Sequence, residues 1–194
     1  MENIKPKILF AKKIGMTQIF VDDKALPVTV LEALPAEVFE IKNKNKDGYS
    51  AVVLKFDGKL KEFRSPENLF QKGEKIDVSV FQKGEKINIR SQRKAKGFAG
   101  VVKRYGFAGG PRTHGQKDKE RSPGSIGQRW PQRVRKGLRM AGRISSNFVT
   151  VKNLEVVDVI PEKSLILVKG SVPGPKKRLI EVRSGWLTNK GKIR

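Results

Sequence analysis

The sequence contains no cysteine and a single histidine, His114, among its 194 residues. The lack of cysteine excludes disulfides, zinc–cysteine sites, iron–sulfur clusters and thiol nucleophiles, and one histidine cannot build a multi-histidine metal site. No stretch approaches the roughly 18 apolar residues of a membrane span, and the first residues lack the long apolar stretch of a signal peptide. We therefore expect a cytosolic, soluble protein with no metal and no membrane partner. We also expect no cofactor and no small-molecule substrate.

Acidic residues are scarce beside basic ones: 42 Lys and Arg residues stand against 19 Asp and Glu residues, which gives a net charge of +23. More than half of this excess lies in one segment. Residues 91–144 hold 15 basic and 2 acidic residues, a net charge of +13, together with 10 of the 19 glycines. A chain with this charge is expected to bind a polyanion.

The larger apolar residues of 91–144 are too scattered to bury the surface that would offset the ordering entropy of the segment. The segment is therefore either disordered or ordered by a partner. A solvated basic loop is one interpretation, and a nucleic-acid-binding segment is the other. Two features favour nucleic acid: arginine, which suits planar phosphate and base contacts better than lysine, dominates the later positive charge, and aromatic residues are interleaved with it.

Short runs typical of β-strands, bounded by turn residues, occupy the rest of the chain. They lie at 27–31, 38–42, 49–56, 76–80, 148–151, 154–160, 165–168 and 179–182. Helical periodicity is nearly absent, apart from a short helix expected within 98–105. Neither flank alone has enough strands to close a barrel. We therefore expect residues 1–90 and 145–194 to form one discontinuous β-barrel domain, with 91–144 inserted as a long extension.

The heptapeptide FQKGEKI occurs twice, at 70–76 and at 81–87. Each copy is expected to form a turn centred on Gly73 or Gly84, followed by an alternating strand. One pair of copies is too short for a solenoid, so the repeat predicts no function.

Motifs that carry catalytic chemistry are incomplete. The glycine-rich stretch 106–110 lacks the Lys-Ser/Thr pair of a phosphate-binding loop. His114 could act in catalysis only with a carboxylate partner, and Asp118 and Glu120 lie near it in sequence. The alternative is a loop histidine that hydrogen-bonds to RNA or stabilises the turn before Gly115. We favour this alternative and expect no catalytic residue, because a flexible basic loop holds catalytic groups too loosely.

The basic segment carries four motifs that resemble the signature of the third family of large-subunit ribosomal proteins: KGFAGVVKRYGF at 96–107, THG at 113–115, SPGSIG at 122–127 and KGLRMAG at 136–142. The resemblance continues in order over nearly the whole chain, which has the length of the bacterial members. It includes KKIGMTQIF at 12–20, PVTV at 27–30, DGY at 47–49 and LILVKGSVPG at 165–174.

The resemblance implies a translation-protein-type β-barrel and a mostly irregular extension that penetrates ribosomal RNA toward the peptidyl-transferase centre. It implies a structural protein, not an enzyme, in the large subunit of the cytoplasmic ribosome. Such a protein is a primary binder near the 3′ end of the large ribosomal RNA and nucleates subunit assembly. The protein neighbours implied in the same way are the universal fourteenth and the bacterial nineteenth proteins of the large subunit.

In such an extension, cations neutralise phosphates and release counterions. The expected phosphate contacts, of which a few are expected to be only solvated charges, are Arg104, Arg112, Arg121, Arg129, Arg133, Arg135, Arg139 and Arg143, with support from Lys94, Lys96, Lys103 and Lys136. His114 is expected to contact RNA beside Gly115. Trp130, placed by the resemblance at the tip, either stacks on an unpaired base or packs against its own loop, for example on Val134. We favour stacking.

Two other functions fit a basic β-protein. An RNA-modifying enzyme with a β-barrel binding module would need a cofactor pocket or an acid–base pair, and the sequence supplies neither clearly. A nucleic-acid-binding regulator outside the ribosome needs neither, and only its failure to sediment with the large subunit would separate it from a ribosomal protein.

Overall fold

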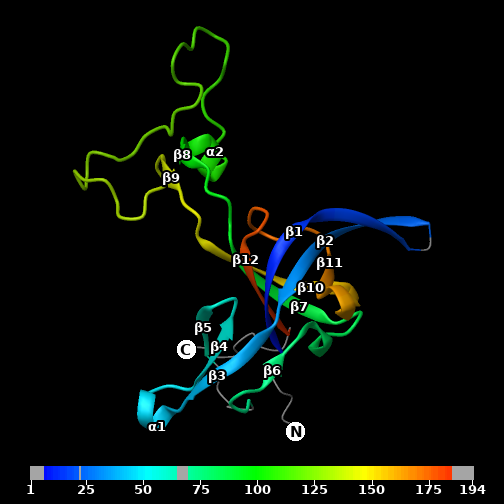
Figure 1. Ribbon diagram of the computed structural model, residues 1–194. Helices are drawn as coiled ribbons and strands as arrows, with labels where there is room; N and C mark the ends of the chain where they lie inside the picture. The colour runs from blue at the N-terminus through cyan, green and yellow to red at the C-terminus, as the bar shows by residue number, and fades with distance from the viewer. Residues whose placement is uncertain (1–6, 22, 65–69, 185–194) are drawn as a thin grey trace. The chain divides into compact units, whose positions relative to one another are not determined.

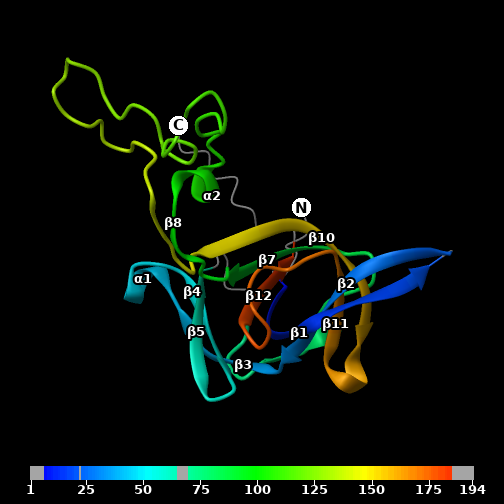
Figure 2. The same ribbon diagram turned by 90° about the horizontal axis from the view of Figure 1, so that it is seen from above.

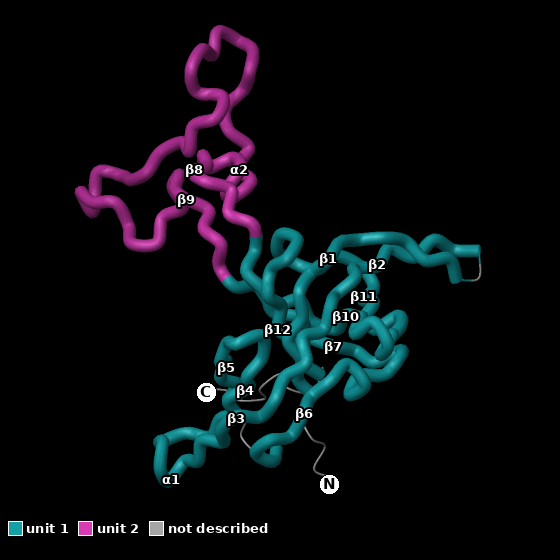
Figure 3. Tube along the Cα trace, in the orientation of Figure 1, with its two compact units in different colours: residues 1–93, 148–194 teal, residues 94–147 magenta. Residues whose placement is uncertain are grey.

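The computed structural model describes residues 7–21, 23–64 and 70–184. Contacts between Cα atoms divide the chain into two compact units, 1–93 with 148–194 (unit 1) and 94–147 (unit 2), which Figure 3 distinguishes by colour. Unit 2 begins and ends a few residues further along the chain than the expected extension, 91–144. The prediction of a mainly β fold is confirmed (Figure 1).

Six antiparallel strands of unit 1 close into a barrel, in the order β1–β12–β7–β10–β11–β2 (Figures 1 and 2). Closure joins both sides of the insertion, because β7, which precedes it, pairs with β10 and β12, which follow it. The barrel strands are β1 (Ile8–Val21), β2 (Lys24–Leu34), β7 (Lys86–Gln92), β10 (Phe148–Ile160), β11 (Leu165–Lys169) and β12 (Leu179–Ser184).

Alternate residues of β7 and β12 contribute to the barrel core, because successive side chains of a strand point to opposite faces, whereas β1 is buried on both faces from Ile8 to Ala11. Ile87 and Ile89 of β7 and Ile180 and Val182 of β12 have no solvent exposure. The register places Val182 opposite Ile89, so the buried side chains of neighbouring strands meet on the same face.

A second sheet of unit 1 has four strands in the order β5–β4–β3–β6: β5 (Lys59–Arg64), β4 (Ala51–Phe56), β3 (Ala36–Lys42) and β6 (Lys75–Ile76). The expected strands 38–42 and 49–56 lie here and not in the barrel, which corrects the prediction of a single barrel. Pro35 separates β2 from β3 and has no N–H group to continue the ladder. Phe10 of β1 stacks on Phe56 of β4, with ring centroids 4.4 Å apart, so the two sheets share one core.

The strand predicted at 76–80 is wrong. β6 ends at Ile76, and a 3-10 turn, η1 (Val78–Val80), follows it. The N–H of Phe81 donates to the carbonyl of Val78 at 3.1 Å. Ile76, Val78 and Phe81 are each only 3% exposed. The turn thus brings a third apolar side chain into the core, where a continuing strand with a period of two would point it to the other face.

The strands predicted at 148–151 and 154–160 form one strand, β10, with a bulge between Val151 and Leu154. Asn153 in the bulge has a φ of 57°, a left-handed conformation that asparagine tolerates better than most residues. Its N–H donates to Oδ1 of the buried Asn88 at 3.0 Å. The interruption in the sequence pattern therefore marks an irregularity within a strand and not its end.

The two copies of FQKGEKI adopt the same structure, and we call 70–76 the first clip and 81–87 the second clip. In the first clip, the N–H of Gly73 donates to the carbonyl of Val38 at 2.8 Å. The N–H of Val38 donates in return to the carbonyl of Glu74 at 2.9 Å. This exchange fastens the first clip to β3.

The second clip makes the same exchange with β10. The N–H of Gly84 donates to the carbonyl of Val156 at 2.8 Å, and the N–H of Val156 donates to the carbonyl of Glu85 at 2.9 Å. The strand segments that receive the clips are also alike, AEVFE at 36–40 and LEVVD at 154–158, and each has a register shift after its valine. The repeat is therefore a duplicated fastening, one copy for each sheet.

The remaining short elements are α1 (Lys44–Asp47) and η2 (Pro161–Lys163) in unit 1, and β8 (Gly97–Ala99), α2 (Val101–Tyr105) and β9 (Gly142–Ile144) in unit 2. The helix expected within 98–105 thus begins later, at Val101. Within the described part of the chain, no helix has the length and apolar character needed to cross a bilayer.

The shared core predicts a large loss of stability when the Phe10–Phe56 stack is removed. Phe10 is 1% exposed, so Phe10→Ala should lower the free energy of unfolding by about 3–5 kcal/mol. Phe20→Ala is the matched control, because Phe20 is 68% exposed and its loss should change stability by less than about 0.5 kcal/mol. Urea unfolding followed by far-ultraviolet circular dichroism measures both, and equal midpoints for the two variants would contradict the assigned core.

Candidate nucleic-acid interface

Unit 2 is built on a small ordered base. β8 and β9 pair antiparallel, with Gly97 opposite Ile144 and Ala99 opposite Gly142, and α2 follows β8 directly. Ala99 and Val101 are its buried apolar residues in the described structure, each 3% exposed. Residues 106–141 between α2 and β9 form turns and loops without a described helix or strand. The base is therefore small relative to the chain that it supports.

Arg104 of α2 fastens this base. Its Nη1 donates to the carbonyl of Met140 at 2.8 Å, and its guanidinium lies 5.0 Å from the centre of the Tyr105 ring. Gly142 leaves the space that this side chain occupies, because a Cβ there would overlap the guanidinium. Arg104 is one of the expected phosphate contacts. In the structure, it makes an internal hydrogen bond that connects α2, where the loops begin, with Met140, where they end.

A first loop, residues 106–124, is closed by backbone contacts. The N–H of Gly110 donates to the carbonyl of Glu120 at 2.9 Å. Gly109 has a φ of 78°, and a Cβ at this position would overlap the same carbonyl oxygen. Nε of Arg112 donates to Oε1 of Glu120 at 2.7 Å. Glu120, one of the two carboxylates considered as a partner for His114, therefore pairs with Arg112.

His114 lies at the turn of this first loop. It has a φ of 60° and the next residue, Gly115, has a φ of 76°. The N–H of Gln116 donates to the carbonyl of Thr113 at 3.4 Å, which closes the turn. The imidazole is exposed. This arrangement favours a loop histidine at the turn that can meet a partner outside the protein.

A second loop, residues 125–139, carries Trp130. The hydroxyl of Ser125 donates to the carbonyl of Gly127 at 2.7 Å, and the N–H of Arg133 donates to the carbonyl of Pro131 at 2.6 Å, so local turns shape the loop. The indole of Trp130 is 76% exposed, and Val134, the alternative packing partner, is itself 45% exposed. The loop does not bury the indole, whose surface is open to a base.

The predicted RNA contacts share one property, which is exposure of the side chain: apart from the half-buried Arg104, all of them are exposed. They come from both loops and from the base of unit 2. Unit 2 as a whole, residues 94–147, holds 14 basic and 2 acidic residues. The exposed ones are Lys94, Lys96, Lys103, Arg112, His114, Arg121, Arg129, Trp130, Arg133, Arg135, Lys136, Arg139 and Arg143.

A second group of cations lies on unit 1, and the sequence interpretation missed it. It consists of Lys12, Lys59, Lys176, Lys177 and Arg178, which line one surface pocket. The run of three basic residues after the glycine and prolines of 173–175 was the available signal. Lys12 and Lys59 gave no such signal, because only the folded chain brings them to the run.

Comparison with known proteins decides the family. A family model for ribosomal protein L3 matches residues 60–164, more than half of the chain. The chain belongs to the ribosomal protein L3 family. The membership predicted from the motifs of the basic segment is thereby confirmed.

Curated relatives extend the match to 90–92% of this chain. The large ribosomal subunit protein uL3 of Herpetosiphon aurantiacus is 47% identical, over 90% of this chain and 94% of the relative. The protein of the same name from Chloroherpeton thalassium is 42% identical, over 90% of this chain and 97% of the relative. That of Streptococcus pyogenes serotype M18 is 43% identical, over 92% and 96%.

The closed first loop predicts a sharp difference between two glycines. Gly109→Ala should open the loop, because alanine adds about 1–2 kcal/mol of strain in a left-handed conformation and its Cβ overlaps the Glu120 carbonyl. Gly127→Ala is the control, because a Cβ there meets only the Arg133 carbonyl oxygen, at 4.0 Å. Hydrogen exchange of the Gly110 amide should accelerate in the first variant alone. Unchanged exchange in Gly109→Ala would contradict the closed loop.

Proposed function

We propose that the chain is a structural constituent of the large ribosomal subunit and that unit 2 binds large-subunit ribosomal RNA in the cytoplasmic ribosome. The observation that carries the proposal is the net charge of +12 on residues 94–147, displayed on exposed side chains over a very small core. Membership of the ribosomal protein L3 family supports it. A polyanion supplies the compensating charge that the protein itself lacks.

The binding mechanism is neutralisation of phosphates by fixed cations. Each Lys or Arg that meets a phosphate releases condensed counterions, which favours association at low salt. Contacts with RNA add to the local hydrogen bonds of the loops and offset the remaining ordering entropy. Glycines such as Gly109 permit close approaches of the backbone that side chains would block.

The finer role follows from the family resemblance. The chain is a primary binder near the 3′ end of the large ribosomal RNA, nucleates subunit assembly, and extends unit 2 toward the peptidyl-transferase centre without performing chemistry. The pairing of Glu120 with Arg112 supports a non-catalytic role for the first loop. The universal fourteenth and bacterial nineteenth proteins of the large subunit are its neighbours.

Sedimentation of the tagged full chain tests the proposal directly. On a sucrose gradient of cell lysate, the chain should sediment with the large subunit, whereas a regulator outside the ribosome should stay at the top. A primary binder should also bind protein-free large-subunit RNA without other proteins. Failure to bind that RNA until other proteins are added would contradict the primary role.

The phosphate mechanism predicts a steep dependence on salt. With about ten phosphate contacts, log K should fall against log[salt] with a slope of about −9 on duplex-like RNA. Filter binding of the full chain to in-vitro-transcribed large-subunit RNA between 0.05 and 0.3 M KCl, about a sixfold range, measures this slope. A flat response would rule out the phosphate mechanism.

Stacking by Trp130 predicts a loss of affinity without a change in salt dependence. Trp130→Ala should weaken binding by about 1–3 kcal/mol, or roughly 5- to 150-fold, with the slope unchanged because no charge is removed. Trp130→Phe should keep much of the affinity, and Phe20→Ala, an exposed aromatic of unit 1, should keep all of it. Equal affinity of Trp130→Ala and the unmodified chain would mean that no base stacks there.

A further inference from the structure

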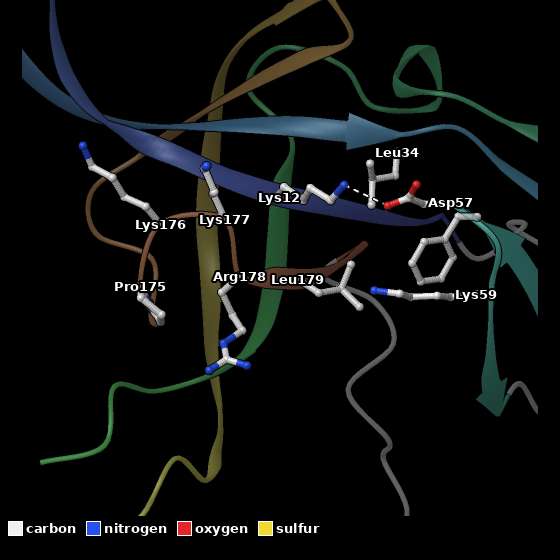
Figure 4. Close-up of a pocket in the computed structure, with 10 residues that line it drawn as sticks. Lys12, Leu34, Asp57, Lys59, Pro175, Lys176, Lys177, Arg178 and Leu179 are labelled. Atoms are coloured by element: carbon white, nitrogen blue, oxygen red, sulfur yellow. Dashed lines mark hydrogen bonds and ion pairs between the residues drawn. The ribbon is translucent and has the colours of Figure 1, made fainter. Parts of the chain in front are cut away.

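Unit 1 has a surface pocket of about 370 Å³ between four segments of the chain (Figure 4). These are β1, the end of β2, the turn between β4 and β5 with the strand residues beside it, and the loop that leads into β12. Leu34, Phe56 and Leu179 give it apolar walls. Its charged lining consists of one carboxylate, Asp57, and five cations, Lys12, Lys59, Lys176, Lys177 and Arg178. The pocket therefore carries an uncompensated charge of +4.

The loop that supplies three of these cations has a fixed backbone. The N–H of Lys177 donates to the carbonyl of Lys13 at 2.7 Å, and the N–H of Lys13 donates to the carbonyl of Arg178 at 3.2 Å. Nζ of Lys13 donates to the carbonyl of Val172 at 2.6 Å. Gly174 has a φ of 103°, and a Cβ there would lie 2.9 Å from a backbone oxygen of β7. The barrel therefore holds the backbone that carries the cations.

The charge of Lys12 is partly compensated inside the pocket. Its Nζ donates to Oδ2 of Asp57 at 2.9 Å, the contact drawn as a dashed line in Figure 4. This hydrogen bond and the attraction between the two charges lower the pKa of the Asp57 carboxyl and raise the pKa of the Lys12 ammonium. Both groups are therefore ionised at neutral pH, and Asp57 restrains one of the five cations.

We propose that this pocket is a second RNA-binding site, which holds the sugar–phosphate backbone of large-subunit ribosomal RNA independently of residues 94–147. The proposal rests on the function proposed above, and it adds a site on the other unit of the chain. Lys and Arg side chains are pure hydrogen-bond donors, and phosphate oxygens are pure acceptors. Cations of this kind form charge-assisted hydrogen bonds with phosphate oxygens.

An acidic protein segment is the alternative occupant, and the backbone hydrogen bonds disfavour one that would bind as an added strand. A peptide that adds to a sheet needs free N–H and C=O groups along an edge. Here Lys13 and the loop at 177–178 already use these groups with each other. What the pocket offers to a ligand is the positive charge of its side chains. This charge suits the backbone of a nucleic acid, which carries a phosphate at every nucleotide.

Removing the charge of the loop is the first test. The triple variant Lys176→Gln, Lys177→Gln and Arg178→Gln keeps the backbone bonds and removes three cations. Its control, Lys72→Gln, Lys83→Gln and Lys163→Gln, removes three exposed lysines of unit 1 outside the pocket. With in-vitro-transcribed large-subunit RNA, the pocket variant should reduce the salt slope by roughly 2 to 3 and the affinity at least about tenfold. The control should match the unmodified chain.

Freeing Lys12 is the second test, and it should increase affinity. Asp57→Asn releases the ammonium and suits the backbone, because Asp57 has a φ of 47° and asparagine tolerates that region. One further phosphate contact should steepen the slope by about 0.7–0.9 and raise affinity at 0.15 M salt roughly fivefold. Glu162→Gln, an exposed site outside the pocket, changes the net charge equally. It should raise affinity less.

Acetylation footprinting locates the contact. In the complex with RNA, Lys59, Lys176 and Lys177 should be protected from an amine-acetylating reagent while Lys72, Lys83 and Lys163 remain reactive. If the chain binds RNA but both triple variants behave alike and no pocket lysine is protected, the second site is overturned and the function of unit 2 stands. If the unmodified chain shows no salt-dependent RNA binding, the proposed function itself fails. Protection by a polyglutamate peptide and not by RNA would assign the pocket to an acidic protein.

Discussion

The pairing of β7 with β10 is the interaction on which the rest of the structure depends. It closes the barrel, and its register sets Gln92 opposite Phe148, the last barrel residue before unit 2 and the first one after it. Both ends of a long insertion are therefore neighbours on one ladder. Because the entropy of closing a loop grows only by about 0.6 kcal/mol for each doubling of its length, a barrel built in this way tolerates a long insertion without a second anchor.

The two units differ in how much of their own stability they supply. Unit 1 buries a continuous apolar core shared by two sheets, so it supplies its own stability. Unit 2 has a small base held together by the hydrogen bond of Arg104, for which Gly142 leaves space, and its exposed cations repel one another. Its few internal pairs, such as Arg112 with Glu120, remove little of that repulsion. In the free protein, the exposed arginines repel one another and the exposed indole stays in contact with water. A bound polyanion would neutralise the arginines and could cover the indole.

The sequence predicted what depends on local pattern. Short runs typical of β-strands, bounded by turn residues, marked most strands, including 27–31 and 179–182, and composition located the basic segment. It could not predict that Pro35 ends the barrel strand and starts a second sheet, or that core packing replaces the strand at 76–80 by a turn. It also missed the pocket on unit 1, because Lys12, Asp57 and Lys177 meet only through long-range strand pairing. Whether the predicted contacts bind RNA remains a prediction.

The duplicated clips have a consequence for how the chain finds its fold. Each clip offers the same donors and acceptors, and Val38 and Val156 receive them in the same way. Hydrogen bonding alone therefore does not distinguish the native arrangement from one in which the first clip pairs with β10 and the second clip pairs with β3. The discrimination comes from chain connectivity and from the different side chains around each valine. Two fastenings of identical sequence eleven residues apart thus depend on their surroundings, and not on their own hydrogen-bonding groups, for a single native pairing.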